Sequence, residues 1–291
     1  MVCSLLLAGY AARRLKRLPD NAADVLNRFI VDVCVPATIL RLVPKLSFEP
    51  SLAVLVVIPW LLAALAYVVA RVAARALALD RGTATALFLA TALGNTSFLG
   101  FPLCGALLGE RSIPLAAVYD QLGSFLLLST IAPFALAKVS EGTPPTWKEI
   151  ARRVLLFPPF IALVLALVPW PHPAALESLL AAAAAPLVPL AMFAVGLKLR
   201  LTPPRPARVL WLGLLLKLVL FPCVAWGVAR GLGAQGLVLE VAVLEAAMPT
   251  MITAGALLMA FGVASDLSAA FVGWGLMLSL LSVPGWSLLL R

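Results

Sequence analysis

The sequence predicts an all-helical protein that crosses a membrane many times. Of its 291 residues, 63% are hydrophobic and 12% are charged, and the mean hydropathy is +1.06. A soluble globular chain carries about 25% charged residues. The apolar residues form long continuous runs, whereas a transmembrane barrel would show alternating segments of roughly 10 residues. Helices are expected because they satisfy their own backbone groups within lipid.

Ten apolar segments define the predicted helices. They cover about 1–12, 22–43, 51–73, 84–108, 113–137, 153–170, 174–197, 207–230, 236–261 and 267–290. The first, "MVCSLLLAGYAA", is shorter than the roughly 20 residues that span a bilayer. A signal peptide would carry its positive charges before the apolar run, and here they follow it. We therefore expect an incomplete first helix, from a truncated or misplaced start.

Basic residues concentrate on one side of this topology. Fifteen of the Lys and Arg residues lie in or beside the loops of one side, and five on the other. The positive-inside rule then places both termini outside and loop 138–153 in the cytoplasm, as a multi-pass protein of the inner or plasma membrane. The net charge of +9 follows from this topology, so the bilayer and not nucleic acid is the expected partner.

The cysteines and the single histidine predict neither a metal site nor a disulfide. Cys3, Cys34, Cys104 and Cys223 all fall in apolar segments and show no CxxC spacing. One histidine, His172, cannot assemble a metal site by itself. No cofactor is expected.

The chain divides into two halves that resemble each other. A cytoplasmic linker at 140–150 separates a first unit, 1–139, from a second, 151–291. "VPATILRL" in segment two, with Pro36, corresponds to "VPLAMFAVGL" in segment seven, with Pro189. Five segments per half is an odd number, so the second half enters the membrane in the opposite sense. Inverted repeats with a broken helix in each are typical of secondary transporters.

Segment four contains helix breakers and polar groups in the middle of an uncharged stretch. The motif "GNTSFLGFPLCG" supplies Gly94, Asn95, Thr96, Ser97 and Pro102. Pro102 has no N–H, so a carbonyl one turn earlier loses its helical partner. Freed backbone groups are tolerated at that depth only where protein or a watery cavity satisfies them. An ordinary proline kink is the alternative for one such segment alone.

Segment nine repeats this pattern at the corresponding place in the second half. Its "AAMPTMITAG" contributes Met248, Pro249, Thr250 and Thr253, and it lies about 151 residues after the interruption in segment four. Two breaks at matching positions predict a substrate site where the two segments meet. Half-helix N-termini at the breaks would offer positive dipole ends to a carboxylate.

Four polar residues near mid-depth are candidates for coupling or charge balance. They are Asp120 and Gln121 in segment five, Lys217 in segment eight and Glu245 in segment nine. An ionisable group at the bilayer centre costs about 2.5–3.5 kcal/mol on insertion scales. Each also has a structural alternative, such as bracing a neighbouring helix. Glu245 is the hypothesised link to a proton or Na⁺.

Segment two carries a charged pair of its own. Arg28 and Asp32 lie four residues apart, the spacing of an intrahelical ion pair. Asn27 is a weaker candidate for the site.

These residues resemble the auxin efflux carrier family, in its bacterial branch, related to the plant auxin carriers. The resemblance rests on "LPDNAADVLNRFIVDVCVPATIL", "GNTSFLGFPL", "AAVYDQLGSFLLL", "LKLVLFP" and "LEAAMPTMITAGALLMAFGVASDLSAAFVGWGLMLSLLSVPGW". It covers almost the whole chain. The short cytoplasmic loop points to the bacterial branch.

The resemblance implies a fold and a mechanism. It implies ten transmembrane helices in two inverted five-helix repeats, with broken, crossing helices four and nine, similar to the bile acid/sodium symporters. Helices three to five and eight to ten would move against the others. The family carries organic anions such as malate, malonate or indole-3-acetate. A homodimer through helices two and seven is left open.

The predicted function is a secondary transporter that moves a small organic anion, a mono- or dicarboxylate, by alternating access. Two alternatives remain at this point. One is an intramembrane hydrolase with a Ser–Lys dyad that uses Lys217, although the sequence has no HExxH or GxSxG motif. The other is a ligand sensor that does not transport. An enzyme is not the expectation.

Overall fold

The computed structural model describes residues 2–46, 49–140, 142–168, 173–199, 201 and 206–290. His172 lies outside these residues. The described chain is helical and contains no strand, apart from one isolated bridge between Gly94 and Thr250. Each of the ten predicted apolar segments is helical over most of its described length. The prediction of an all-helical, polytopic protein is confirmed at this level.

Among the described residues, five continuous helical stretches are long and apolar enough to cross a membrane. They are Pro50–Ala76, Glu110–Val139, Ala174–Lys198, Ala207–Gly231 and Ser265–Leu289. Thr96–Leu108 is a shorter apolar helix.

The described part of the first half contains nine α-helices, several of which follow one another within one predicted segment. Their bounds are α1 Val2–Arg14, α2 Ala22–Phe29, α3 Val35–Leu42, α4 Ala53–Ala76, α5 Arg81–Ala92, α6 Phe101–Leu108, α7 Ile113–Tyr119, α8 Phe125–Ser129 and α9 Ile131–Val139.

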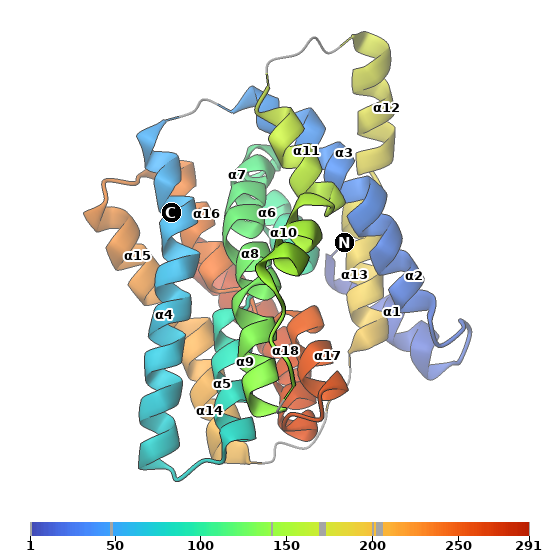
Figure 1. Ribbon diagram of the computed structural model, residues 1–291. Coiled ribbons are helices and arrows are strands. Elements are labelled where there is room, and N and C mark those ends of the chain that lie inside the picture. Colours follow the sequence, from blue (N-terminus) through green and yellow to red (C-terminus); the bar gives the residue numbers. More distant parts are fainter. Residues whose placement is uncertain are drawn as a thin grey trace.

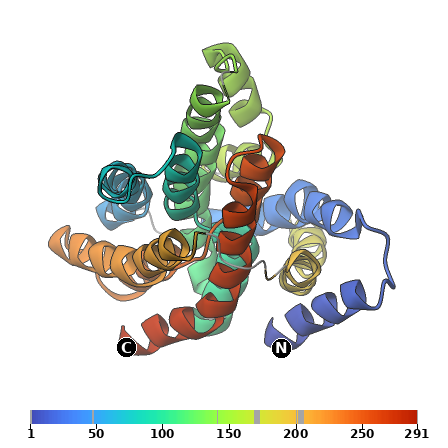
Figure 2. The same cartoon turned by 90° about the horizontal axis from the view of Figure 1, so that it is seen from below.

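The second half continues in the same manner. Its helices are α10 Trp147–Leu155, α11 Pro158–Ala166, α12 Ala174–Ala184, α13 Leu187–Lys198, α14 Ala207–Leu215, α15 Phe221–Gly231, α16 Gly236–Ala246, α17 Ile252–Ala260 and α18 Ser265–Leu289. In both views α1, α2 and α13 lie together on one side of the molecule, and α4, α14 and α15 lie on the other (Figures 1 and 2).

Two glycines allow α1 and α13 to pack with their backbones in contact. A β-carbon added at Gly9 would lie 2.1 Å from the Phe193 carbonyl oxygen, and one at Gly196 would lie 2.1 Å from the Leu6 carbonyl oxygen. Small residues that let helix backbones approach are typical of membrane helix interfaces. This contact holds α1 against α13 of segment seven.

Four π-helical turns occur among the described residues, and three of them lie just before a proline. The turns are Ile30–Cys34, Thr96–Gly100, Asp120–Ser124 and Leu216–Leu220. The first, second and fourth are followed by Pro36, Pro102 and Pro222, each the second residue of the next α-helix. Because proline offers no N–H to the fourth residue before it, the preceding turn widens.

Segment six differs from the single helix predicted at 153–170. Helix α10 begins at Trp147, inside the predicted 140–150 linker, because Thr146 and Glu149 form a capping box at its start. It ends at Leu155, since Pro158 and Pro159 begin α11 and force Phe157 into an extended conformation. The helical part of the second half therefore starts earlier than predicted, and its first segment is bent.

Candidate functional site

Segment four breaks just before its polar motif. Helix α5 ends at Ala92, and Leu93 is extended, with φ −103° and ψ 104°. The chain resumes helical form at Thr96. The break therefore falls at Leu93–Asn95 and not at Pro102, which lies inside the next helix. Pro102 instead accounts for the π-turn that follows the break.

Segment nine breaks at the predicted proline. Helix α16 ends at Ala246 and α17 begins at Ile252, with Met251 extended between them at φ −60° and ψ 129°. In Figure 1, α5 and α17 lie toward one end of the molecule, and α6 and α16 lie nearer the other. Both broken segments thus place one half-helix on each side of the break.

The two breaks satisfy each other's backbone groups. The Asn95 N–H donates to the Pro249 carbonyl at 2.7 Å, and the Met251 N–H donates to the Leu93 carbonyl at 2.9 Å. This is the antiparallel bridge between Gly94 and Thr250. The Thr250 hydroxyl adds a bond of 2.8 Å to the Ala90 carbonyl. The expectation that segments four and nine meet at their breaks is confirmed for these residues.

Asp120 is buried beside the segment-four break, and its carboxylate accepts hydrogen bonds from neighbouring polar groups. Its side chain is 1% exposed. The Thr96 hydroxyl donates to one carboxylate oxygen, and the Gln121 amide donates to the other at 2.6 Å. Ser97, the next residue after Thr96, lines the same cavity as Asp120. Because carboxylates accept hydrogen bonds and the Thr96 and Gln121 groups donate, the arrangement suits an ionised Asp120.

Glu245 lies on the other side of the break, in contact with segments four and eight. Its side chain is fully buried. One carboxylate oxygen receives the Cys104 thiol at 3.4 Å, and the other has no hydrogen-bond partner among the described residues. A β-carbon added at Gly100 would lie 2.5 Å from the carboxylate, so a larger residue there would require the Glu245 side chain to shift.

Lys217 completes this buried group. It is 4% exposed, and its positive charge acts on Glu245. A β-carbon at Gly94 would lie 3.1 Å from its ammonium nitrogen. Lys217 of segment eight and Glu245 of segment nine therefore lie beside the backbone pairing, where the charge of Lys217 acts on Glu245.

A cavity of about 400 Å³ opens beside the crossing. It is bordered by the last residue of each break and by the first turn that follows, namely Asn95, Ser97 and Phe98 in segment four and Met251, Ile252 and Thr253 in segment nine. Asn95 is 2% exposed, and its amide oxygen has no hydrogen-bond partner within the described chain. Amide N–H groups at helix starts lack intrahelical partners and favour anions. The cavity thus has the features of a small anion site.

The structure separates the predicted site residues into two groups. Asn95, Ser97, Asp120 and Thr253 line the cavity. The remaining predicted residues lie outside the described lining: Gly94, Thr96, Pro102, Gln121, Lys217, Glu245, Met248, Pro249 and Thr250. Of these, Gly94, Met248, Pro249 and Thr250 form or adjoin the backbone pairing, and Thr96 and Gln121 hold Asp120.

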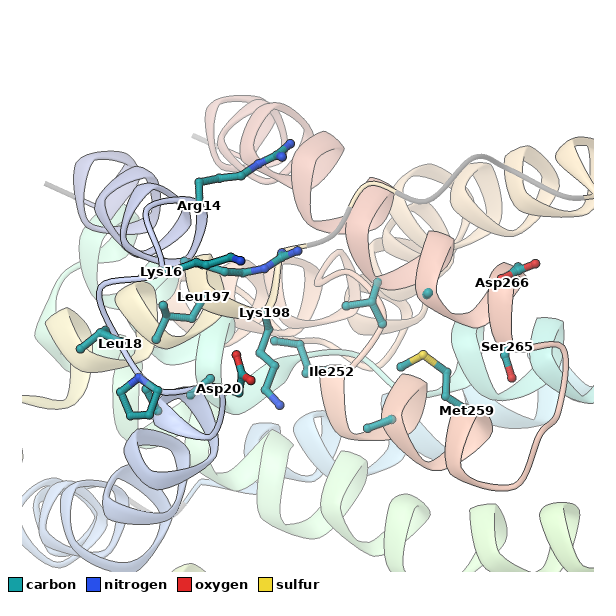
Figure 3. A pocket seen from close by; sticks show the side chains of 17 residues that line it. Arg14, Lys16, Leu18, Asp20, Leu197, Lys198, Ile252, Met259, Ser265 and Asp266 are labelled. Carbon is teal, nitrogen blue, oxygen red and sulfur yellow. The ribbon is translucent and has the colours of Figure 1, made fainter.

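A larger cavity of about 1120 Å³ adjoins the first. The two share Lys198, Ile252 and Ala256 in their linings. Figure 3 shows Arg14, Lys16 and Lys198 on one side of it and Asp266 across from them. Its basic residues come from the loop side that the charge count assigns to the cytoplasm.

The opposite end of the molecule is held by ion pairs. Arg41 of α3 contacts Glu110 at 2.8 Å and Glu177 of α12 at 3.2 Å. Lys45 also contacts Glu177, at 2.8 Å. These contacts join segments two and seven to the connection between segments four and five. The two ends therefore differ, one hollowed by a large cavity and the other tied by charges.

Comparison with known proteins agrees with this architecture. A family model described as "Membrane transport protein" matches residues 1–145 and 139–287. This chain belongs to that family, the auxin efflux carriers. The expected resemblance is confirmed.

Relatives of this family member are named as transporters. It is 30% identical to an "Uncharacterized transporter" of Methanothermobacter thermautotrophicus, over 99% of this chain and 96% of that protein. A relative from Methanocaldococcus jannaschii, also named an uncharacterized transporter, is 26% identical over 86% of this chain and 84% of its own. A protein of Rhizobium meliloti named "Putative malonate transporter" is 30% identical over 99% and 93%.

Sequence reasoning missed part of the cavity of this membrane transport protein. Lys198 and Asp24 line it and form an ion pair of 2.6 Å across 174 residues of sequence. Phe125 and Phe157 also line it and stack with their centroids 4.0 Å apart. Residues so far apart in the sequence share no spacing pattern from which such contacts could be predicted. The predicted Arg28–Asp32 pair is confirmed at 3.3 Å, and with Asn27 it lies in the cavity lining.

Proposed function

We propose that this protein is a secondary transporter that moves a small organic anion, a mono- or dicarboxylate, by alternating access at the crossing of segments four and nine. The observation that carries the proposal is the small cavity, which is bordered by the starts of both half-helices. Two helix N-termini that converge on one cavity favour a carboxylate there. The family and the names of its relatives indicate a transporter rather than an enzyme.

The fold proposed for this function has ten transmembrane helices in two inverted repeats, 1–139 and 151–291, on either side of the 140–150 linker. The short helices of segments four, six and nine then belong to spans that are broken or bent. Both termini would lie outside the inner or plasma membrane. A cysteine placed at Ser140 in a Cys-less background should react only with membrane-permeant reagents, and reaction with impermeant reagents in intact cells would reverse the orientation.

The difference between the two ends supports alternating access. The large cavity opens on the proposed cytoplasmic side, where four basic and two acidic side chains line it. On the other side Arg41, Glu110, Lys45 and Glu177 tie the segments together. We assign this arrangement to a state open to the cytoplasm, in which an excess of basic groups attracts anions to the site.

Malonate is the first substrate to test, because one relative is named "Putative malonate transporter". Purified protein in proteoliposomes should take up one or more labelled mono- or dicarboxylates, and protein-free liposomes should not. Absence of uptake or exchange for the whole panel, with and without ion gradients, would contradict the proposal. Hydrolysis of ester or peptide substrates without transport would favour the enzyme alternative, and binding without transport would favour the sensor.

A further inference from the structure

We propose that Asp120 takes up the proton that accompanies each substrate anion, so that anion and proton cross the membrane together. This inference rests on the proposed function, because it requires an anion in the cavity beside Asp120. It names the coupling ion and the group that binds it.

The charges around the cavity are the first argument. Five charged side chains belong to its described lining. Lys198 pairs with Asp24 at 2.6 Å, and Arg28 pairs with Asp32 at 3.3 Å. Asp120 is thus left, within this described lining, without a cationic partner. An anion entering the cavity would meet a buried negative charge. Like charges at close range favour protonation of one of them.

Hydrogen bonds around Asp120 provide a route for this coupling. Ser97 lines the cavity together with Asp120, and its hydroxyl acts on the carboxylate. A substrate carboxylate that accepts the Ser97 hydroxyl turns that group away from Asp120 and brings a second negative charge. Both effects favour a protonated Asp120. The Thr96 hydroxyl can then rotate, since a hydroxyl both donates and accepts, and receive the new O–H.

The same geometry favours a proton over a metal ion. Both carboxylate oxygens of Asp120 already face donors, one the Thr96 hydroxyl and the other the Gln121 amide. A sodium ion would need both of these groups to turn, so that an oxygen and not an N–H or O–H hydrogen faces it. A proton requires only that one hydroxyl turn.

Several other titratable groups lie near Asp120, and one of them, Glu245, serves as the control in the experiment. Glu245 of α16 acts on it electrostatically, and Tyr119 precedes it in the chain. Asp24, Arg28, Asp32 and Lys198 share the cavity with it from α2, the adjacent π-turn and α13. Glu245, the coupling group hypothesised from sequence, lies outside the described cavity linings. Its role in coupling is untested, so the same experiment compares the two carboxylates.

The experiment uses labelled malonate and proteoliposomes that enclose a pH-sensitive dye. In wild type, a malonate gradient should move protons with the anion, and an imposed pH gradient should drive malonate accumulation. Malonate affinity should rise by up to about tenfold per unit fall in pH, over a range in which malonate keeps both charges. In Asp120→Asn, malonate affinity should not depend on pH over that range, whereas Glu245→Gln should keep the dependence.

The outcomes are distinct. Malonate transport by wild type without dye response or pH-driven accumulation overturns the inference and leaves the proposed function intact. So does accumulation driven by a Na⁺ gradient alone. Loss of pH dependence in Glu245→Gln with its retention in Asp120→Asn assigns the proton to Glu245 instead. If no carboxylate of the panel moves, the proposed function itself has failed. The wild-type dye measurement decides the matter even if a variant does not fold.

Discussion

Asp120 and Glu245 are buried carboxylates on either side of the same helix crossing, and their surroundings differ. Asp120 borders a cavity, and both of its oxygens accept hydrogen bonds. Glu245 lies outside the described cavity linings, with a thiol contact on one oxygen and the charge of Lys217 nearby. The first can respond to a solute that enters the cavity. The second is surrounded by fixed protein groups, which suits a role in holding the crossing together.

The largest expected effect tests the structural role of Glu245. Glu245→Gln leaves the buried Lys217 ammonium without the carboxylate that offsets its charge. The two groups form no direct ion pair in the described structure, so the loss should reach at most about 3–5 kcal/mol of unfolding free energy, which is the cost of breaking a buried pair. Thermal unfolding of the detergent-purified protein should show this loss, and the double variant Lys217→Met/Glu245→Gln should recover most of it. A double variant no more stable than Glu245→Gln would show that the two charges do not support each other.

Gly100→Ala should disturb the same side of the crossing by sterics. The added β-carbon would overlap the Glu245 carboxylate, and overpacking of this kind costs about 1–3 kcal/mol. Gly227→Ala is the matched control, because its β-carbon meets no atom within 4 Å in the described structure. Melting temperatures should fall for the first variant only. Equal melting temperatures would mean that the carboxylate moves aside freely.

Thr250→Val tests the side-chain bond that joins the two broken segments. The Thr250 hydroxyl bonds the Ala90 carbonyl of the other segment, and losing such a bond costs about 0.5–1.5 kcal/mol. Thr91→Val is the control, because the Thr91 hydroxyl bonds the Leu87 carbonyl of its own helix, at 2.7 Å. We expect a lower melting temperature for the Thr250 variant than for the Thr91 variant. A lower melting temperature for the Thr91 variant than for the Thr250 variant would show that the Thr250–Ala90 bond does not stabilise the crossing.

Asp80→Asn, far from both carboxylates, should have the smallest effect. Asp80 caps α5, and hydrogen bonds from Thr83 hold the pKa of Asp80 below its ordinary value of 3.8. Its stabilisation is therefore complete at neutral pH and is lost as the pH falls below that value. Asparagine caps about as well, so the difference at neutral pH should be under about 0.5 kcal/mol. The difference in unfolding free energy between wild type and Asp80→Asn should shrink further in acid, and a difference that grows in acid would contradict this account.

The sequence was sufficient to predict the helical class, the two broken segments and their meeting. Prolines and glycines in long apolar runs constrain the backbone locally, so they identify the two segments that break. In segment four the sequence pointed to Pro102, whereas the break lies at Leu93–Asn95. The cavity lining was only partly predictable, because it depends on tertiary packing. Lys198 and Asp24 are distant in sequence and carry no shared motif. Glu245 and Asp120 look alike in sequence, and only packing separates a cavity residue from an enclosed one.

The most direct test of the central claim, that the cavity at the crossing binds the substrate, is the thermal unfolding of Asn95→Ala. It is measured with and without saturating amounts of the anion that wild-type proteoliposomes transport. The Asn95 amide oxygen has no partner in the described chain, so its loss should leave the ligand-free melting temperature near that of wild type. The unmet polar group should cost about 1–3 kcal/mol of binding, or roughly 5- to 150-fold in affinity. The account predicts that the ligand-induced rise in melting temperature is lost or greatly reduced. A lowered ligand-free melting temperature with the full rise retained would contradict it.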